Sequence, residues 1–189
     1  MRILIIDNYD SFTFNLKHDL ERIDEVEVDV VRNDVLDFNS FSDYDRIVLS
    51  PGPGLPEESG QLMEAIHRLK DMQIPVLGVC LGLQALVQYT GGKLYNLGTV
   101  RHGISFPSKV DVNDSLYRDL SENQKFGMYH SWAAQKPLND EWRISAESEE
   151  GIIMSIRHID LPWVAVQYHP ESVLSPNGRL ILKNWIERA

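Results

Sequence analysis

The chain has a single cysteine, Cys80, and it lies in the sequence Gly78-Val79-Cys80-Leu81-Gly82. An apolar run precedes this stretch (74–77), and a run typical of a helix follows it (83–89). Glycines on both sides permit a tight strand-to-helix turn, a nucleophile elbow, which lifts the central side chain clear of the sheet. A helix N-terminus favours the thiolate, which is the reactive form of cysteine. Cys80 is therefore a candidate nucleophile, although many free cysteines are inert apolar core residues.

A candidate base and its orienting acid follow the predicted strand 163–167, in the sequence His169-Pro170-Glu171. Residues i and i+2 of an extended chain point the same way, and the proline favours extended geometry at His169. Glu171 can then lie beside the imidazole, orient it and stabilise its charged form. With Cys80, the two residues would complete a Cys-His-acid triad for nucleophilic catalysis.

Strands alternate with helices in the first half of the chain, as its apolar periodicity shows. The pattern predicts strands at 3–6, 26–32, 47–49 and 74–79, with helices at 12–22, 60–71 and 83–89. Such alternation is typical of an α/β fold with a mostly parallel central sheet and helices on both faces. Ligands bind beyond the carboxyl ends of such strands. The Asp7 turn, the loop 50–56 and the cysteine elbow all lie at those ends.

The second half has a different character after Gly91-Gly92. Strands are predicted at 100–112, 126–131, 143–148, 152–158 and 163–167, without long helices between them. We expect them to extend the sheet in an antiparallel manner, so that residues 1–189 form one domain. Asp10 or Ser11 is predicted to cap the first helix, and Ser175-Pro176 to start a closing helix that ends near 188.

Composition excludes several classes of function. The 189 residues include 18 Lys and Arg against 28 Asp and Glu, and the resulting net charge of −10 disfavours nucleic acid or anionic membranes as partners. No apolar segment approaches the roughly 18 residues of a membrane span. One cysteine cannot form an internal disulfide, which fits a reducing compartment, and we expect a cytoplasmic protein. No His or Cys set has metal-ligand spacing, so we predict no metal and no cofactor.

Five motifs in order make the chain resemble the class I (triad-type) glutamine amidotransferases over essentially its whole length. More narrowly, it resembles the small glutaminase subunits (component II) of anthranilate synthase and aminodeoxychorismate (para-aminobenzoate) synthase. The motifs are Asp7-Asn8-Tyr9-Asp10-Ser11-Phe12-Thr13, Ser50-Pro51-Gly52-Pro53-Gly54, Gly78-Val79-Cys80-Leu81-Gly82, Tyr129-His130-Ser131 and His169-Pro170-Glu171-Ser172. The resemblance implies a flavodoxin-like parallel sheet extended by antiparallel strands.

The resemblance also implies roles for these residues. Cys80 would attack the side-chain amide carbon of L-glutamine, His169 would pass its proton to the departing ammonia, and Glu171 would hold His169. The oxyanion would be met by the backbone N–H groups of Leu81 and Gly52. The substrate's polar groups would be held by Gly52, Gly54, Gln84, His130 and Ser131. One position departs from the family pattern, since Leu83 stands where many members have His.

A partner is implied as well, because family members deliver ammonia to a synthase subunit that converts chorismate. We expect a separate chorismate-using synthase subunit (component I), making anthranilate, aminodeoxychorismate or both. Two alternatives stay open from the residues alone. One is a catalytically idle regulatory subunit of the same fold, and the other is an unrelated thiol hydrolase, for which the Gly-x-Cys-x-Gly elbow would suffice.

Overall fold

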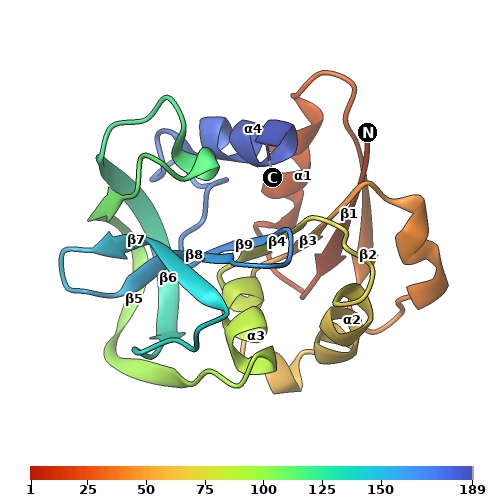
Figure 1. Ribbon diagram of the computed structural model, residues 1–189, viewed down its shortest axis with the longest axis horizontal. Helices are drawn as coiled ribbons and strands as arrows, with labels where there is room; N and C mark the ends of the chain where they lie inside the picture. Colours follow the sequence, from red (N-terminus) through yellow and green to blue (C-terminus); the bar gives the residue numbers. More distant parts are fainter. Residues whose placement is uncertain (189) are drawn as a thin grey trace.

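A single mixed sheet of nine strands organises the computed structural model, which describes residues 1–188, with the side chains of 99–101 and 188 left aside. The strand order is β2-β1-β3-β4-β9-β8-β7-β5-β6 (Figure 1). The strands are β1 (Arg2–Asp7), β2 (Glu27–Arg32), β3 (Arg46–Leu49), β4 (Val76–Val79), β5 (Leu94–Val110), β6 (Asn123–Ala134), β7 (Trp142–Ser148), β8 (Ile153–His158) and β9 (Trp163–Val166). The helices are α1 (Thr13–Glu21), α2 (Leu62–Leu69), α3 (Leu81–Tyr89) and α4 (Gly178–Arg188), with short 3-10 turns at Phe38–Asp43, Pro56–Glu58 and Ser115–Tyr117.

The five strands β2, β1, β3, β4 and β9 are parallel to one another, and helices cover both faces of this part of the sheet. Alternate residues of β1 point to opposite faces: Ile3 and Ile5 pack with α1 and α4, while Leu4 and Ile6 pack with α2 and α3. Figure 1 shows the two helix pairs on opposite sides of the sheet. A strand buried on both faces must be apolar throughout, which explains the unbroken run 3–6.

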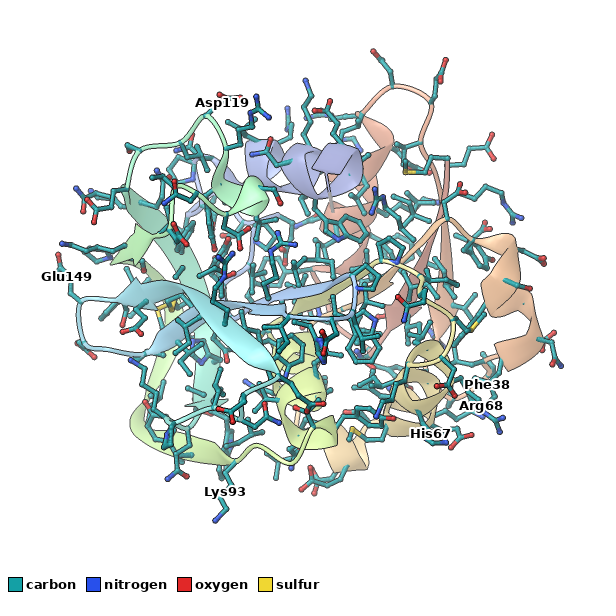
Figure 2. The ribbon with its side chains drawn as sticks, viewed as in Figure 1. Phe38, His67, Arg68, Lys93, Asp119 and Glu149 are labelled. Atoms are coloured by element: carbon teal, nitrogen blue, oxygen red, sulfur yellow. The ribbon has the colours of Figure 1, made fainter. Side chains whose placement is uncertain are left out.

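The remaining strands, β8, β7, β5 and β6, join the same sheet through antiparallel pairing that begins at β9. The predicted fold class, a parallel α/β sheet extended by antiparallel strands, is therefore confirmed. The β5 strand begins at Leu94, earlier than predicted, because Leu94 already pairs with Ala134 of β6. The turn between β7 and β8 carries Glu149 to the outer edge of the molecule, far from the centre of the sheet (Figure 2).

Two predicted helix caps are wrong. The residue that caps α1 is Phe12, which makes no side-chain cap hydrogen bond, while the carboxylate of Asp10 accepts from the Phe12 N–H at 2.7 Å. Helix α4 begins only at Gly178, and the Ser175 hydroxyl is used elsewhere. It donates to the carbonyl oxygen of His169 at 2.7 Å and accepts from the N–H of Gly127 at 2.9 Å. Ser175 therefore fastens the segment after β9 to β6.

Candidate active site

Cys80 occupies the sharp turn between β4 and α3 with φ +53° and ψ −100°, a backbone conformation that is costly for a residue with a side chain. Its N–H donates to the carbonyl oxygen of Val166 in β9 at 2.8 Å. A Cβ atom on Gly78 would lie 2.7 Å from the carbonyl carbon of Gly82, and one on Gly82 would collide with the carbonyl oxygen of Leu49. The turn therefore requires glycine on both sides of the cysteine, as the elbow interpretation predicted.

His169 and Glu171 form a buried pair at the end of β9. Nδ1 of His169 lies 2.7 Å from Oε1 of Glu171, and the two side chains are 3% and 0% exposed. Burial on its own would lower the pKa of His169, but the interactions with Cys80 and Glu171 outweigh it and raise the pKa to about 10. The imidazole is thus held in its charged form, with Nδ1 donating to the carboxylate.

The His169 ring is fixed from several sides. Its backbone N–H donates to the carbonyl oxygen of Gly127 at 3.1 Å. The rings of Phe12 and Tyr129 contact the imidazole, with centroid distances of 5.3 and 4.9 Å. Tyr129 is itself tied to Ser172 by a hydrogen bond of 2.9 Å between the hydroxyl groups. The contact of Phe12 with His169 was not predicted from the sequence.

The thiol and the imidazole meet because β4 and β9 are neighbours. Val79 pairs with Val166, so Cys80 and His169 both follow the carboxyl ends of adjacent parallel strands. The neighbouring Cys80 contributes to the raised pKa of His169. Among the described residues, Nε2 of His169 has no aligned hydrogen-bond partner. Catalytic hydrogen bonds are often long or poorly aligned in ligand-free active sites.

A cavity of about 210 Å³ opens in front of the sulfur. Its walls include every residue that the sequence assigned to substrate binding, together with the nucleophile: Gly52, Pro53, Gly54, Cys80, Gln84, Tyr129, His130, Ser131 and Trp132. Leu81 starts α3 beside the cysteine, where the first N–H groups of a helix have no partner within the helix. The fold thus brings the predicted nucleophile and the predicted binding residues to one cavity.

The loop after β3 is packed too closely to tolerate a side chain at Gly52. A Cβ atom there would lie 2.6 Å from Cβ of Asn8 and 2.7 Å from Cδ2 of Leu81. Gly54 has φ +74°, a conformation that favours glycine. Gly52 therefore packs closely against the side chains of Asn8 and Leu81.

Asn8 is a structural support of this loop that the sequence did not single out. The side chain is 2% exposed, and its Nδ2 donates to the carbonyl oxygen of Ser50 at 2.9 Å. The Asn8 N–H donates to the Ser50 hydroxyl at 2.8 Å, and Oδ1 accepts from Asn33 at 2.9 Å. The available signal was an amide side chain directly after a buried strand.

Two further polar residues of the cavity share one acceptor. Nε2 of Gln84 donates to the carbonyl oxygen of Trp132 at 2.9 Å, and Nδ1 of His130 lies 2.7 Å from the same oxygen. Leu83, the departure from the family pattern, is fully buried in the core that α3 forms with α2 and does not line the cavity. An apolar residue therefore suits that position.

Among residues 1–188, His, Cys, Asp and Glu side chains nowhere gather in threes in a way that could hold a metal ion. No helix in this part combines the length and the apolar character needed to cross a bilayer. The chemistry available at the cavity is that of a thiol beside a charged imidazole, which suits acyl transfer through a thioester.

The fold and the site thus combine an α/β sheet with a cysteine and a buried His–Glu pair at the carboxyl ends of two neighbouring parallel strands. Residues 4–189 match the family model described as glutamine amidotransferase class-I. The chain is 44% identical over 190 residues to anthranilate synthase component 2 of Haemophilus influenzae, covering 98% of this chain and 96% of the relative. It is 38% identical over 188 residues to aminodeoxychorismate/anthranilate synthase component 2 of Bacillus subtilis, covering 98% and 95%.

A solved structure of a glutamine amidotransferase from Thermotoga maritima shares the fold, with a TM-score of 0.79 at 20% identity, covering 99% of this chain and 81% of that one. The chain belongs to the class I glutamine amidotransferase family.

Proposed function

We propose that residues 1–189 act as one glutaminase domain that hydrolyses L-glutamine to glutamate and ammonia, with Cys80, His169 and Glu171 as its triad. The observation that carries this proposal is the buried His169–Glu171 pair, 2.7 Å apart, beside the cysteine of a neighbouring strand. The cavity in front of the sulfur, about 210 Å³, has polar walls suited to an amino acid.

The reaction proceeds in two halves. The thiolate of Cys80 attacks the amide carbon of glutamine, and the resulting oxyanion accepts from the N–H groups of Leu81 and Gly52. The carbon–nitrogen bond breaks, His169 gives its proton to the departing ammonia, and a glutamyl thioester remains. Water then attacks the thioester while His169 takes up a proton, and glutamate and the thiol are released. Loss of one oxyanion donor typically lowers the rate by about 100- to 1000-fold.

Substrate recognition falls to the cavity walls. The Gln84 side chain, the backbone of His130-Ser131 and the loop that holds Gly54 would bind the amino-acid head and the amide of glutamine. A site that hydrogen-bonds these groups rejects analogues that lack them, because its own buried polar groups would be left without partners. The site needs no metal or cofactor for this chemistry.

The ammonia is proposed to pass to a separate, chorismate-using synthase subunit. Curated relatives that match the chain over nearly its full length bear the names anthranilate synthase component 2 and aminodeoxychorismate/anthranilate synthase component 2. A component 2 implies a component 1, and free ammonia would be protonated in neutral water. The net charge of −10 argues against nucleic acid as the partner.

The test uses the chain purified with the synthase subunit that accompanies it. Cys80→Ser should abolish synthesis that depends on glutamine, by at least about a thousandfold, and leave synthesis from high ammonia unchanged. If both activities fell together, the proposed division of labour would be wrong. A glutamine-analogue electrophile should label Cys80, and excess glutamine should block the labelling. Failure of glutamine to protect would favour an unrelated thiol hydrolase, and absence of glutaminase activity in the complex would favour an idle subunit.

A further inference from the structure

A buried glutamine side chain lies close to the sulfur of Cys80. Gln167 follows the last residue of β9, and its side chain is fully buried. Its Nε2 lies 3.6 Å from Sγ of Cys80 in hydrogen-bonding geometry. Gln167 continues the alternation of Trp163 and Ala165, whose side chains pack in the core formed with α3. The glutamine therefore points toward the helix that begins at the nucleophile.

The orientation of the Gln167 amide follows from its neighbours. The carbonyl oxygen of Trp132 can only accept, so Gln84 must turn its NH2 group toward it, at 2.9 Å. The same NH2 group donates to Oε1 of Gln167 at 3.4 Å. The Gln167 amide is then left with its N–H groups facing the sulfur. The backbone carbonyl of Trp132 thus fixes the orientation of the Gln84 amide and, through it, that of the Gln167 amide. For an isolated glutamine near a sulfur, the positions of the amide oxygen and nitrogen would remain ambiguous.

We propose that Gln167 is a hydrogen-bond donor to Cys80 that stabilises the thiolate and holds the sulfur in place for attack, with Gln84 as its positioning residue. The proposal rests on the proposed function, since it requires Cys80 to be the nucleophile. An N–H group donates more strongly to a charged acceptor than to a neutral one, so the contact favours thiolate over thiol. The same contact stabilises the sulfur as it leaves the thioester in the second half of the reaction.

The Gln167 amide and the His169 imidazole are held by different partners, so the amide does not disturb the position of the imidazole. Gln167 and His169 are two residues apart on one segment, yet the imidazole is anchored by Glu171 and the amide by Gln84. Removing the amide should therefore leave the His169–Glu171 pair in place. This separation makes the contribution of Gln167 measurable on its own.

The experiment titrates the reactivity of Cys80 in the full chain. Because Cys80 is the only cysteine, alkylation by iodoacetamide followed by mass spectrometry reports on one site. Gln167→Met keeps the length of the side chain and removes the donor. It should shift the midpoint of the rate–pH profile upward by about one pH unit and lower the alkylation rate about tenfold at pH values well below the wild-type midpoint. Gln167→Glu should shift it further, because it sets a carboxylate beside the thiolate.

Gln124→Met is the matched control. Gln124 is also a buried glutamine, 6% exposed, and its amide bonds Ser121 and Asn177 in another part of the protein. The control should keep the wild-type profile even if it lowers stability. Gln84→Met should give a smaller shift of the same sign, and Gln84→Met combined with Gln167→Met should resemble Gln167→Met alone, because Gln84 acts through Gln167.

The thiolate can also be followed directly by its ultraviolet absorbance. For the wild type and for each variant, the absorbance of the same protein carrying Cys80→Ser is subtracted, so that the remaining signal comes from Cys80. The inference on Gln167 is overturned if wild-type Cys80 is reactive near neutral pH and Gln167→Met keeps the same profile, or if Gln124→Met shifts it equally. A wild-type thiol no more reactive near neutral pH than a free cysteine would overturn both this inference and the proposed role of Cys80. The two failures are therefore distinguishable.

Discussion

The carboxylate of Glu171 lies 2.7 Å from Nδ1 of His169, and neither side chain is more than 3% exposed. Because water is excluded from the pair, the carboxylate acts on the imidazole with little screening. The contact also assigns the two ring nitrogens: Nδ1 carries the proton that Glu171 accepts, and Nε2 is directed to Cys80. Each of the first two predictions below follows from this relationship.

Glu171→Gln should impair catalysis without unfolding the protein, since the amide has nearly the same shape. Loss of the negative charge lowers the pKa of His169 and allows the wrong tautomer, so we expect the glutaminase kcat to fall by about 100- to 10,000-fold. The pKa of His169 can be followed by NMR of its ring protons. Glu149→Gln, on the outer turn seen in Figure 2, removes the same charge far from the site and should change neither quantity. Equal losses in the two variants would contradict the prediction.

His169 should make the protein less stable at alkaline pH. Its pKa is raised from 6.5 to about 10 in the folded chain, so the native state binds this proton more tightly than the unfolded state. By linkage, the stabilisation is complete below about pH 6.5 and is lost as the pH rises through about 10. Urea unfolding across this range should show a larger fall in the free energy of unfolding for the wild type than for His169→Gln. Parallel falls would show that His169 is not the group responsible.

Asn8→Ala should weaken the loop that carries the proposed oxyanion donor. The substitution leaves Asn33 and the Ser50 carbonyl group without their buried partner, at a cost of about 1–3 kcal/mol in the free energy of unfolding. Since Gly52 packs against Asn8, we also expect kcat for glutamine to fall about tenfold or more. Asn113→Ala, in an exposed turn, is the control and should cost less than about 1 kcal/mol with no change in kcat. An unchanged kcat in Asn8→Ala would show that Asn8 does not contribute to catalysis through this loop.

Asp114→Asn should destabilise the antiparallel part of the sheet. The carboxylate is 1% exposed and forms two ion pairs. Nη2 of Arg157 lies 2.7 Å from Oδ1, and Nη2 of Arg143 lies 2.9 Å from Oδ2. Burial alone would raise the pKa of Asp114, but Arg157, with help from Leu116 N–H and Arg143, holds it below its usual range. The resulting stability is present above about pH 3.9 and is lost as the pH falls through the lowered value. We expect a cost of about 3 kcal/mol near neutral pH in urea unfolding.

Asp111→Asn is the matched control for Asp114. Its carboxylate lies 3.8 Å from Arg143 but is 34% exposed, so the pair is screened by water and should contribute less than about 1 kcal/mol. If the two substitutions cost the same, burial of Asp114 would not be the source of its effect.

The parts of the fold that were predictable from the sequence are those encoded over short distances. The buried run of β1, the paired glycines around Cys80 and the two-residue spacing of His169 and Glu171 each constrain the backbone locally. The alternation of strands and helices then placed the Asp7 turn, the loop 50–56 and the cysteine elbow at the same edge of the sheet, because each follows the carboxyl end of a parallel strand. The cavity residues Gly52, Gly54 and Gln84 were assigned through family resemblance, and the structure places them together at the cavity.

What the sequence did not reveal depends on contacts between distant segments. Gln167 stands in the same stretch as His169, but its approach to Cys80 is set by the pairing of β4 with β9 and by a carbonyl group of β6. Ser175 looked like a helix cap because its own neighbours favour one, yet its hydroxyl bonds to His169 and Gly127 across the fold. A tertiary hydrogen bond outweighed the local preference.

The position of β9 has a consequence for the making of the protein. This strand is inserted between β4 and β8, although it is the last strand in the chain. While a nascent chain is still emerging from the ribosome, β4 lacks its neighbour on one side, and the carbonyl group that later binds the Cys80 N–H has not yet been translated. Cys80 therefore reaches its final backbone arrangement only after β9 has been synthesised, and until then the open edge of β4 can pair with other chains.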